Sequence, residues 1–175
     1  MTRFSLRFPE DQISAWYSRH VASPEEALIE EAIVPRVRRD GYLTKPDFLV
    51  ICRWKTARTK SRCSGNHEEF IKAVTQVALS VPEERLRIGV LTLLDGVELP
   101  TASTLLHWLH PDPYPILDFR ALWSLGFAGR PRYDFSLWVD YVTFCRGLTA
   151  RNGVSVCILD RALWQYSKEK QKTSM

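Results

Sequence analysis

The sequence predicts an all-α protein, and three observations lead to that fold class. Residues that cap helix N-termini, often followed by proline or glutamate, recur along the whole chain. The apolar residues between them follow helical spacing. Alternating patterns typical of strands are nearly absent, and "RFSLRF" at 3–8 is only a weak candidate. We therefore expect residues 1–175 to form a single helical domain, built as a two-lobed helical bundle.

The first half of the chain contains four expected helix starts. Ser23 with Pro24 and Glu26 forms a capping box that opens a helix ending at Asp40-Gly41, where glycine supplies a left-handed cap. Three later starts combine a capping residue with proline or glutamate, namely Thr44 with Pro46, Asn66 with Glu69, and Ser80 with Glu83. Helical spacing predicts that the last two of these helices bury Phe70, Val74, Val77, Ala78, Leu86, Val90, Leu91 and Leu94.

The second half contains four more expected helices. Pro100 opens one that would bury Ala102, Leu105, Leu106 and Leu109. Asp118 and Asp134 are expected N-caps, the second of a helix through about Cys145, and a last helix follows "RNG" at 151–153. The apolar faces of these helices carry three tryptophans expected in the core, Trp123, Trp138 and Trp164. If the chain has a domain boundary, we expect it in the loop at 126–132 or at 152–153.

The composition excludes several classes of protein. The chain has 24 Lys+Arg against 20 Asp+Glu, a net charge of +4, which permits a polyanionic partner. Its four cysteines form no CxxC pair and no metal-binding spacing, so we expect reduced thiols, a cytoplasmic location and no cofactor. No apolar run approaches the roughly 20 residues of a membrane helix, so no membrane partner is expected. His107 and His110 lack a third ligand, which favours packing or surface roles over a metal site.

The stretch "LLDGVELPTASTLLHWL" at 93–109 predicts two helices joined by a very short turn that contains Gly96. Such a turn leaves backbone N–H groups of the turn and of the second helix without intrahelical acceptors. Together with the helix dipole, these N–H groups can bind a phosphate. The alternative is an ordinary αα-hairpin whose glycine only relieves backbone strain.

Residues after the turn make this pattern more specific. The chain reads "LDGVE" at 94–98, then Thr101-Ala102, then "YPILD" at 114–118. This order resembles the helix–hairpin–helix DNA glycosylase superfamily, the endonuclease III-like enzymes, over about residues 80–127, with the motif itself at about 83–109. Asp118 follows Gly96 by 22 positions (118 − 96), which is similar to the family's separation. The strings "RWKTAR" and "LDRALWQYS" also look like those of a bacterial branch and imply no function by themselves.

The resemblance implies a hydrolase that excises a base, with Asp118 as its catalytic carboxylate. The aspartate would stabilise the positive charge that develops on the sugar as the glycosidic bond breaks, and would orient a water. Pro100 stands where bifunctional relatives carry a lysine, which implies a monofunctional enzyme without lyase activity. Glu98 replaces the second glycine of the turn, where a carboxylate opposes phosphate binding unless it turns away. The alternative for Asp118 is a structural role as a helix cap.

The densest positive run is "RWKTARTKSR" at 53–62, which contains no acidic residue. Its cations can neutralise phosphates and its tryptophan can stack on a base, unless the run is a solvated helix end with the tryptophan buried. Arg120 either clamps a phosphate or is an exposed arginine at a helix start. The expected nucleic-acid contacts are therefore Gly96, Val97, Glu98 and Thr101 of the turn, with Arg53, Trp54, Lys55, Arg58 and Arg120.

These patterns lead to two hypotheses from different classes. The first is a DNA-binding protein, with duplex DNA as its partner, that excises a damaged base as a monofunctional DNA N-glycosylase with Asp118 in a cleft between lobes. The second is a non-enzymatic helical module that kept the fold and binds nucleic acid or a protein partner. Glu98 and the modest net charge favour the module, whereas the position of Asp118 favours the enzyme.

Overall fold

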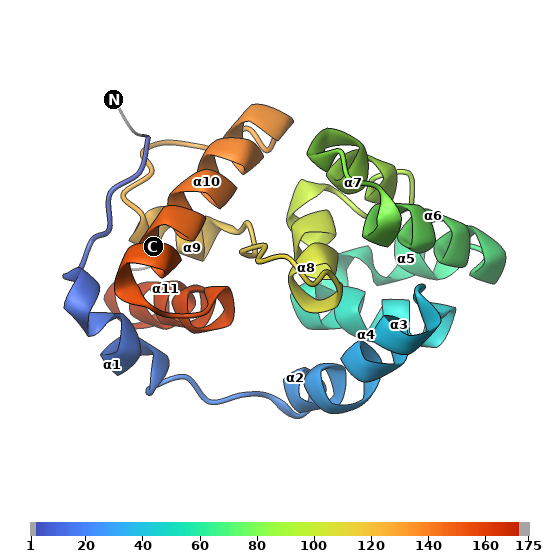
Figure 1. The fold of residues 1–175 in the computed structure, drawn as a ribbon, viewed down its shortest axis with the longest axis horizontal. Helices are drawn as coiled ribbons and strands as arrows, with labels where there is room; N and C mark the ends of the chain where they lie inside the picture. Colours follow the sequence, from blue (N-terminus) through green and yellow to red (C-terminus); the bar gives the residue numbers. More distant parts are fainter. Residues whose placement is uncertain (1–2, 172–175) are drawn as a thin grey trace. The chain divides into compact units, whose positions relative to one another are not determined.

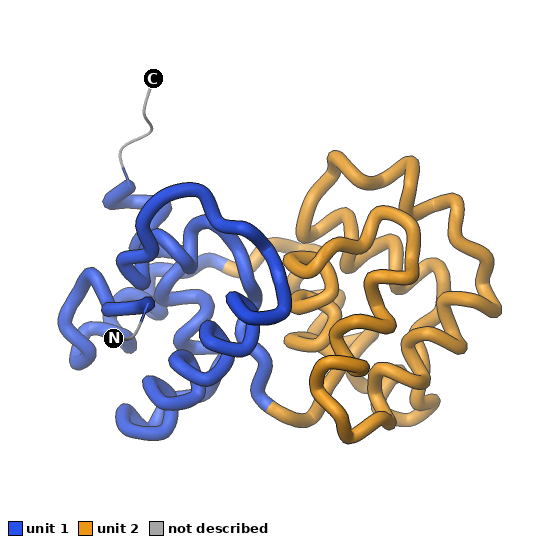
Figure 2. The backbone as a smooth tube through the Cα atoms, turned by 90° about the horizontal axis from the view of Figure 1, so that it is seen from above, with its two compact units in different colours: residues 1–21, 113–175 blue, residues 22–112 orange. Residues whose placement is uncertain are grey.

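The computed structural model describes residues 3–171, and every regular element in this range is a helix, which confirms the all-α prediction. The chain divides into two compact units (Figure 2). Unit 1 consists of Met1–Val21 together with Pro113–Met175, and unit 2 consists of Ala22–Asp112. The loops at 126–132 and 152–153 are therefore not unit boundaries. The chain begins in unit 1, leaves it after Val21 and returns at Pro113, a topology that local composition does not reveal.

Unit 1 is built around its last helix (Figure 1). Its elements are η1 Glu10–Gln12, α1 Ile13–Tyr17, α9 Phe119–Ser124, α10 Phe135–Asn152 and α11 Val156–Lys170. Helix α11 packs against α1, α9 and α10. The segment at 3–8 is not a strand, because its backbone pairs with the end of a helix. Ser5 N donates to Leu125 O at 2.9 Å and Arg7 N donates to Ser124 O at 2.9 Å.

Unit 2 contains the remaining helices, with α8 at its centre. Its elements are α2 Pro24–Leu28, the π-helix η2 Ile29–Ile33, α3 Val34–Asp40, α4 Lys45–Lys55, η3 Ala57–Thr59, α5 Lys60–Gly65, α6 Glu68–Ser80, α7 Glu84–Leu91 and α8 Leu99–Leu109. Helix α8 packs against α3, α4 and α7. The predicted core residues of this helix are all buried, namely Ala102, Leu105, Leu106 and Leu109.

The helix expected over 23–39 is continuous but widens in its middle. Ser23 Oγ accepts from Glu26 N at 3.2 Å, and Gly41 ends α3 with φ at 77°, as the sequence predicts. The π-helical turn η2 lies between α2 and α3 and ends two residues before Pro35. Proline lacks an N–H and its ring crowds the carbonyl four residues earlier, so the widened turn relieves a clash that a regular α-helix would impose.

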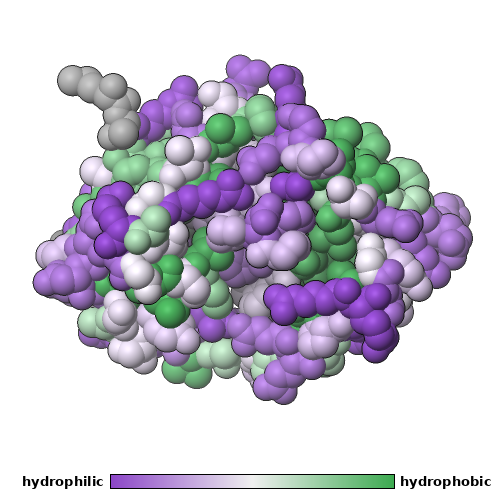
Figure 3. Space-filling view, viewed as in Figure 1, coloured by the Kyte–Doolittle hydropathy of each residue, from purple (hydrophilic) through white to green (hydrophobic). Residues whose placement is uncertain are grey.

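Two expected helix starts are wrong, and so is part of the buried face expected for each of these helices. His67, not Asn66, is the N-cap of α6, and Glu83, not Ser80, caps α7 by accepting from Arg85 N at 3.1 Å. Three of the expected core residues are exposed, namely Phe70, Val77 and Leu86. Helix α6 buries the expected Val74 and Ala78 together with Ile71 and Thr75, which were not expected. Figure 3 shows hydrophobic side chains gathered at the surface of unit 2 on the side that carries α7.

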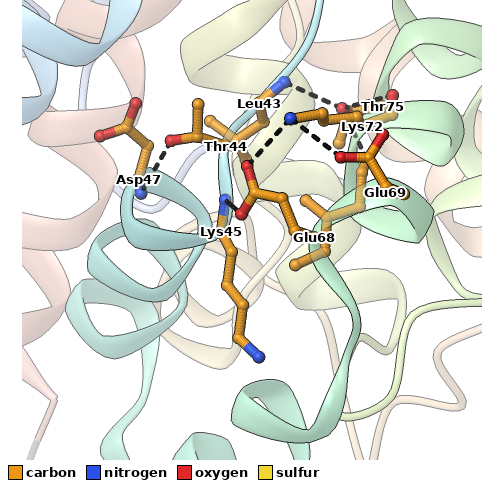
Figure 4. Close-up of polar contacts among 9 residues, drawn as sticks. Leu43, Thr44, Lys45, Asp47, Glu68, Glu69, Lys72 and Thr75 are labelled. Carbon is orange, nitrogen blue, oxygen red and sulfur yellow. Dashed lines mark hydrogen bonds and ion pairs between the residues drawn. The ribbon is translucent and has the colours of Figure 1, made fainter.

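Side-chain contacts from α6 and α3 fix the N-terminus of α4 (Figure 4). The Glu68 carboxylate accepts from Lys45 N at 2.9 Å and lies 3.4 Å from Lys72 Nζ. Thr44 Oγ1 caps the same helix end by accepting from Asp47 N at 3.5 Å, as predicted. Asp47 in turn lies 3.0 Å from Arg36 Nε of α3. These contacts fix the N-terminus of α4 on two sides. They thereby also fix the position of the basic residues at its C-terminus.

Candidate nucleic-acid interface and carboxylate site

The turn between α7 and α8 lies directly on α5, a short helix that the sequence did not predict. Gly96 has φ at +81°, in the left-handed region that favours glycine. A Cβ at this position would lie 2.7 Å from Cys63 Sγ and 3.0 Å from Cys63 N. Both the backbone conformation and the close approach therefore require glycine at this turn.

The side chain of Asn66 holds the turn in place. Its Oδ1 accepts from Asp95 N at 2.9 Å, and its Nδ2 donates to Asp95 O at 3.0 Å and to Cys63 O at 3.0 Å. Asn66 is buried, so these bonds are shielded from water. Asn66 was expected to cap a helix, but its side chain instead holds a turn 29 positions further along the chain. No local pattern indicates this role.

Several backbone N–H groups of the turn have no hydrogen-bond partner in the part of the chain that the structure describes; of these residues, Gly96 and Thr101 are buried, whereas Glu98 is exposed and Leu99 is half-buried. Within residues 3–171, no group accepts a hydrogen bond from the backbone N–H of Gly96, Glu98, Leu99 or Thr101. Val97 is a correction to the expected contacts, because its side chain is buried and its N–H donates to Leu94 O at 3.1 Å. The N–H groups at this helix start form a region of positive potential that suits an anion.

The carboxylate of Glu98 turns away from the turn. Its side chain is 77% exposed, and Arg62 Nη2 lies 3.9 Å from its Oε1. Glu98 is the N-cap of α8, yet its side chain makes no capping hydrogen bond. The carboxylate therefore projects into solvent beside a cation, and it does not fill the N–H region as a cap would.

The basic stretch at 53–62 runs from the end of α4 through η3 into α5 and reaches the turn. Arg62 Cβ would lie only 3.1 Å from a Cβ at Gly96. The arginines and lysine exposed along the stretch are Arg53, Arg58, Lys60 and Arg62, whereas Lys55 is half-buried. Trp54 is also half-buried and packs edge-on against Trp108, with ring centroids 5.4 Å apart. The fold thus brings together two features that lie more than thirty positions apart in the sequence.

Asp118 lies in unit 1 as the N-cap of α9. Its Oδ1 accepts from Ala121 N at 2.8 Å, and the side chain is half-buried. Burial raises the pKa of Tyr133, and the negative charge of Asp118 raises this pKa further. Burial likewise raises the pKa of Tyr141, with added contributions from Cys145, Asp160 and Asp118. The carboxylate is therefore close enough to both tyrosines to oppose their ionisation.

The extended segment at 113–118 that delivers Asp118 is fixed by side chains from α10 and α11. Tyr141 Oη donates to Ile116 O at 2.8 Å, and Asp160 Oδ1 accepts from Ile116 N at 2.9 Å. Arg146 Nε donates to Pro113 O at 2.9 Å. Asp160 of α11 thereby holds this segment in place. These bonds satisfy backbone groups that no helix pairs.

Arg120 lies among aromatic side chains on α9 and α11. Its guanidinium is 5.1 Å from the Phe119 ring and 5.7 Å from the Trp164 ring. Trp123 and Trp164 are half-buried, whereas Trp138 is fully buried as predicted. The expectation of three core tryptophans is therefore wrong for two of them, which lie beside cations: Arg7 is 4.6 Å from the Trp123 ring and Lys168 is 4.9 Å from the Trp164 ring.

His107 and His110 pack within unit 2. His110 is buried and its Nδ1 accepts from Asp112 N at 3.0 Å, while His107 packs edge-on against Trp108. Among the residues that the structure describes, no group of three or more His, Cys, Asp or Glu side chains is placed to hold a metal ion. In the same part of the chain, no helix is both long and apolar enough to cross a membrane.

The residues expected to act together belong to two units. The turn and the basic stretch lie in unit 2, and Asp118 with Arg120 lies in unit 1. Compared with models of protein families, with curated proteins and with solved structures, the chain matches none of them. Its function is therefore inferred from its own residues.

Replacing Gly96 with alanine is expected to lower the free energy of unfolding by about 2–4 kcal/mol, because left-handed strain and overpacking against Cys63 add. Chemical denaturation followed by circular dichroism measures this change.

Two other glycines provide matched controls. Gly41 has φ at +77° but its added Cβ would meet no described atom within 4 Å, so Gly41→Ala should cost only about 1–2 kcal/mol of strain. Gly89 lies inside α7 with open space, so Gly89→Ala should stabilise by about 0.5–1 kcal/mol. Equal losses at Gly96 and Gly41 would show that the contact with Cys63 contributes nothing.

Proposed function

We propose that unit 2 binds the phosphate backbone of duplex DNA through the α7–α8 turn and the basic stretch at 53–62. The observation that carries this proposal is the packing of α5 under the turn, which places Arg62 beside Gly96. Positive side chains and unpaired backbone N–H groups then lie on one continuous part of unit 2. An anion bound there would contact both kinds of donor.

The chemistry of these donors suits a phosphate rather than a base. Backbone N–H groups at a helix start read no base edge, and arginine and lysine contribute affinity by releasing counterions. Among residues 3–171, no carboxylate lies within 4.0 Å of the charged groups of Arg53, Arg58 or Lys60. These cations are therefore not neutralised by close ion pairs. Binding by this surface would be strong at low salt and largely independent of sequence.

We further propose that Asp118 acts in hydrolysis of the N-glycosidic bond of a damaged base, as the resemblance over residues 80–127 implies. A carboxylate stabilises the cationic sugar best when it is already oriented before the reaction. The helix cap at Ala121 N and the bonds that fix the segment at 113–118 supply such an orientation. The activity would be monofunctional, because Pro100 has no amine.

One observation favours the alternative, a binding module without chemistry. Asp134 caps α10 in the same manner as Asp118 caps α9, with Oδ1 accepting from Leu137 N at 3.0 Å. Capping alone therefore explains an aspartate at this position. In that case the nucleic-acid surface of unit 2 would be the whole function.

The binding proposal predicts a reduced salt dependence when the basic stretch loses charge. Replacing Arg53 and Arg58 with glutamine should weaken duplex binding and reduce the slope of log K against log salt by about two, since each lost phosphate contact removes about 0.9. Fluorescence anisotropy with a labelled duplex at several salt concentrations gives the slope. The double variant Arg38→Gln/Arg39→Gln removes the same charge from α3 of unit 2 and should leave the slope nearly unchanged. Equal effects of the two double variants would mean that net charge alone drives binding.

The catalytic proposal predicts that Asp118→Asn lowers the rate of base release by on the order of 10² to 10³, because the amide keeps the shape but loses the charge. Release is measured from oligonucleotides that carry alkylated, oxidised or deaminated bases. Asp134→Asn changes the same kind of cap in the same unit and should retain the parental rate. If the parent protein releases no base from this panel, the binding-module alternative replaces the enzyme.

The position of Pro100 predicts the product. Base release should leave an intact abasic strand, and borohydride should trap no covalent adduct, because an imine requires an amine. Denaturing gels of the reaction with and without borohydride test this expectation. A trapped adduct would require a lysine elsewhere in the chain to act as nucleophile.

A further inference from the structure

Two cysteines meet beneath the α7–α8 turn. Cys52 lies in the last turn of α4 and Cys63 lies in α5, with only the short helix η3 between these elements. Both side chains are buried, and their thiol groups form a hydrogen bond to each other. Neither is part of a disulfide. Helices α4 and α5 pack on each other, and a pair of thiols in contact across them meets the first geometric requirement of a disulfide, that the two sulfurs lie next to each other.

The groups around the two thiols favour Cys63 as the nucleophile of the pair. The hydrogen bond from Cys52 lowers the pKa of Cys63 to about 6 against the opposing effect of burial, with further lowering by Thr59 and by the charge of Arg62. Thr59 Oγ1 lies 3.6 Å from Cys63 Sγ. The same hydrogen bond and burial raise the pKa of Cys52. Of the two thiols, Cys63 is therefore the one that loses its proton more readily, and the thiolate is the reactive form of cysteine.

The helix that shields this pair from solvent, α5, buries few side chains. Cys63 is the only buried residue of α5, and its helix neighbours Arg62 and Ser64 are exposed. Apart from the packing of Gly96 on Cys63 and the hydrogen bond from Asn66 to Cys63 O, this six-residue helix has few contacts that hold it in place, because it buries no other side chain. Local opening of such a segment costs much less than unfolding of the unit. A small reagent therefore has a route to the Cys63 sulfur.

We propose that Cys52 and Cys63 form a redox-active dithiol that reacts with hydroperoxides and closes to a reversible disulfide. This proposal does not rest on the proposed nucleic-acid function, although Cys63 lies under the same turn.

The reaction balances with a hydroperoxide as the oxidant. The Cys63 thiolate attacks a peroxide oxygen, the O–O bond breaks, and the leaving oxygen takes a proton to give water or an alcohol. Cys63 is then a sulfenic acid without negative charge. The sulfur of Cys52 attacks the sulfur of Cys63, the S–O bond breaks, and the proton of Cys52 leaves with the hydroxyl as water. Two thiols lose two electrons to one peroxide.

The other two cysteines provide internal references. Cys145 is buried in α10, and burial raises the pKa of its thiol, so it is a poor nucleophile. Cys157 is half-buried in α11. Both lie in unit 1, so a reaction confined to Cys52 and Cys63 is readily distinguished by the peptides it joins.

The test treats the full chain with hydrogen peroxide at pH 7, quenches the reaction, and counts thiols after denaturation. The protein should lose two of its four thiols and regain them with dithiothreitol, and peptide mapping should join Cys52 to Cys63. Cys157→Ser should retain the loss of two thiols. An undiminished thiol count, or a disulfide between other cysteines, would overturn the proposal.

Single variants separate the roles of the two sulfurs. In Cys52→Ser, oxidation should stop at the sulfenic acid of Cys63, which dimedone labels, whereas Cys63→Ser should show no dimedone label at Cys52. Label on Cys52 alone would reverse the assigned roles and contradict the proposal. All readouts are made without nucleic acid, so their failure would leave the binding proposal untouched, and failure of DNA binding would leave these readouts unchanged.

The rate of disulfide formation should also have a distinctive pH profile. Because Cys63 is deprotonated above its folded pKa of about 6, the rate should rise through pH 6 and level off above pH 7. At pH 6 the rate should be about half its plateau, whereas an ordinary thiol would retain under about one hundredth. A rise centred near pH 9 would show that the thiolate is not stabilised.

Discussion

The close approach of Gly96 to Cys63 is the constraint on which the candidate surface of unit 2 depends. A turn that presses its backbone onto a neighbouring side chain requires glycine at the contact point, and Gly96 supplies both the missing Cβ and the left-handed φ. Asn66 then fixes the same turn through three hydrogen bonds. Helix α5 is held through Cys63, so the position of its cations follows from this contact.

Unit 1 positions its candidate carboxylate differently. Asp118 follows an extended segment and not a turn between helices. The backbone at 113–117 has no helical partners, and each of its polar groups must find another. Side chains of α10 and α11 supply these partners, with Tyr141 and Asp160 pairing both backbone groups of Ile116. The segment is therefore held in place by side chains, although it forms no regular secondary structure. Rigidity of this kind suits a catalytic carboxylate and equally suits a structural cap.

The sequence predicts the features that short-range chemistry determines. Helix caps at Ser23, Thr44, Asp118 and Asp134 are correct because a capping side chain bonds to a backbone N–H only a few residues away. Prolines, glycines and aspartates in the sequence likewise mark most helix ends.

The features that the sequence does not reveal depend on contacts between distant residues. Asn66 has the residue type of a cap, yet its partner Asp95 lies 29 positions away. Phe70 and Leu86 match helical spacing but are exposed, because α6 and α7 turn other faces to the core. Arg62 gains its place beside the turn only through the packing of Cys63. The candidate surface was thus predicted in two separate parts, and only the fold joins them.

Glu98 decides how strongly that surface can bind an anion. Its pair with Arg62 spans 3.9 Å and both side chains are more than half exposed, so solvent and salt screen it and its net stabilisation is small. A phosphate at the N–H groups of the turn would therefore compete for Arg62 at little cost. The carboxylate nevertheless remains close by and repels that phosphate. Glu98 should accordingly weaken phosphate binding at the turn without abolishing it, which leaves most of the affinity to the cations of α4 and η3.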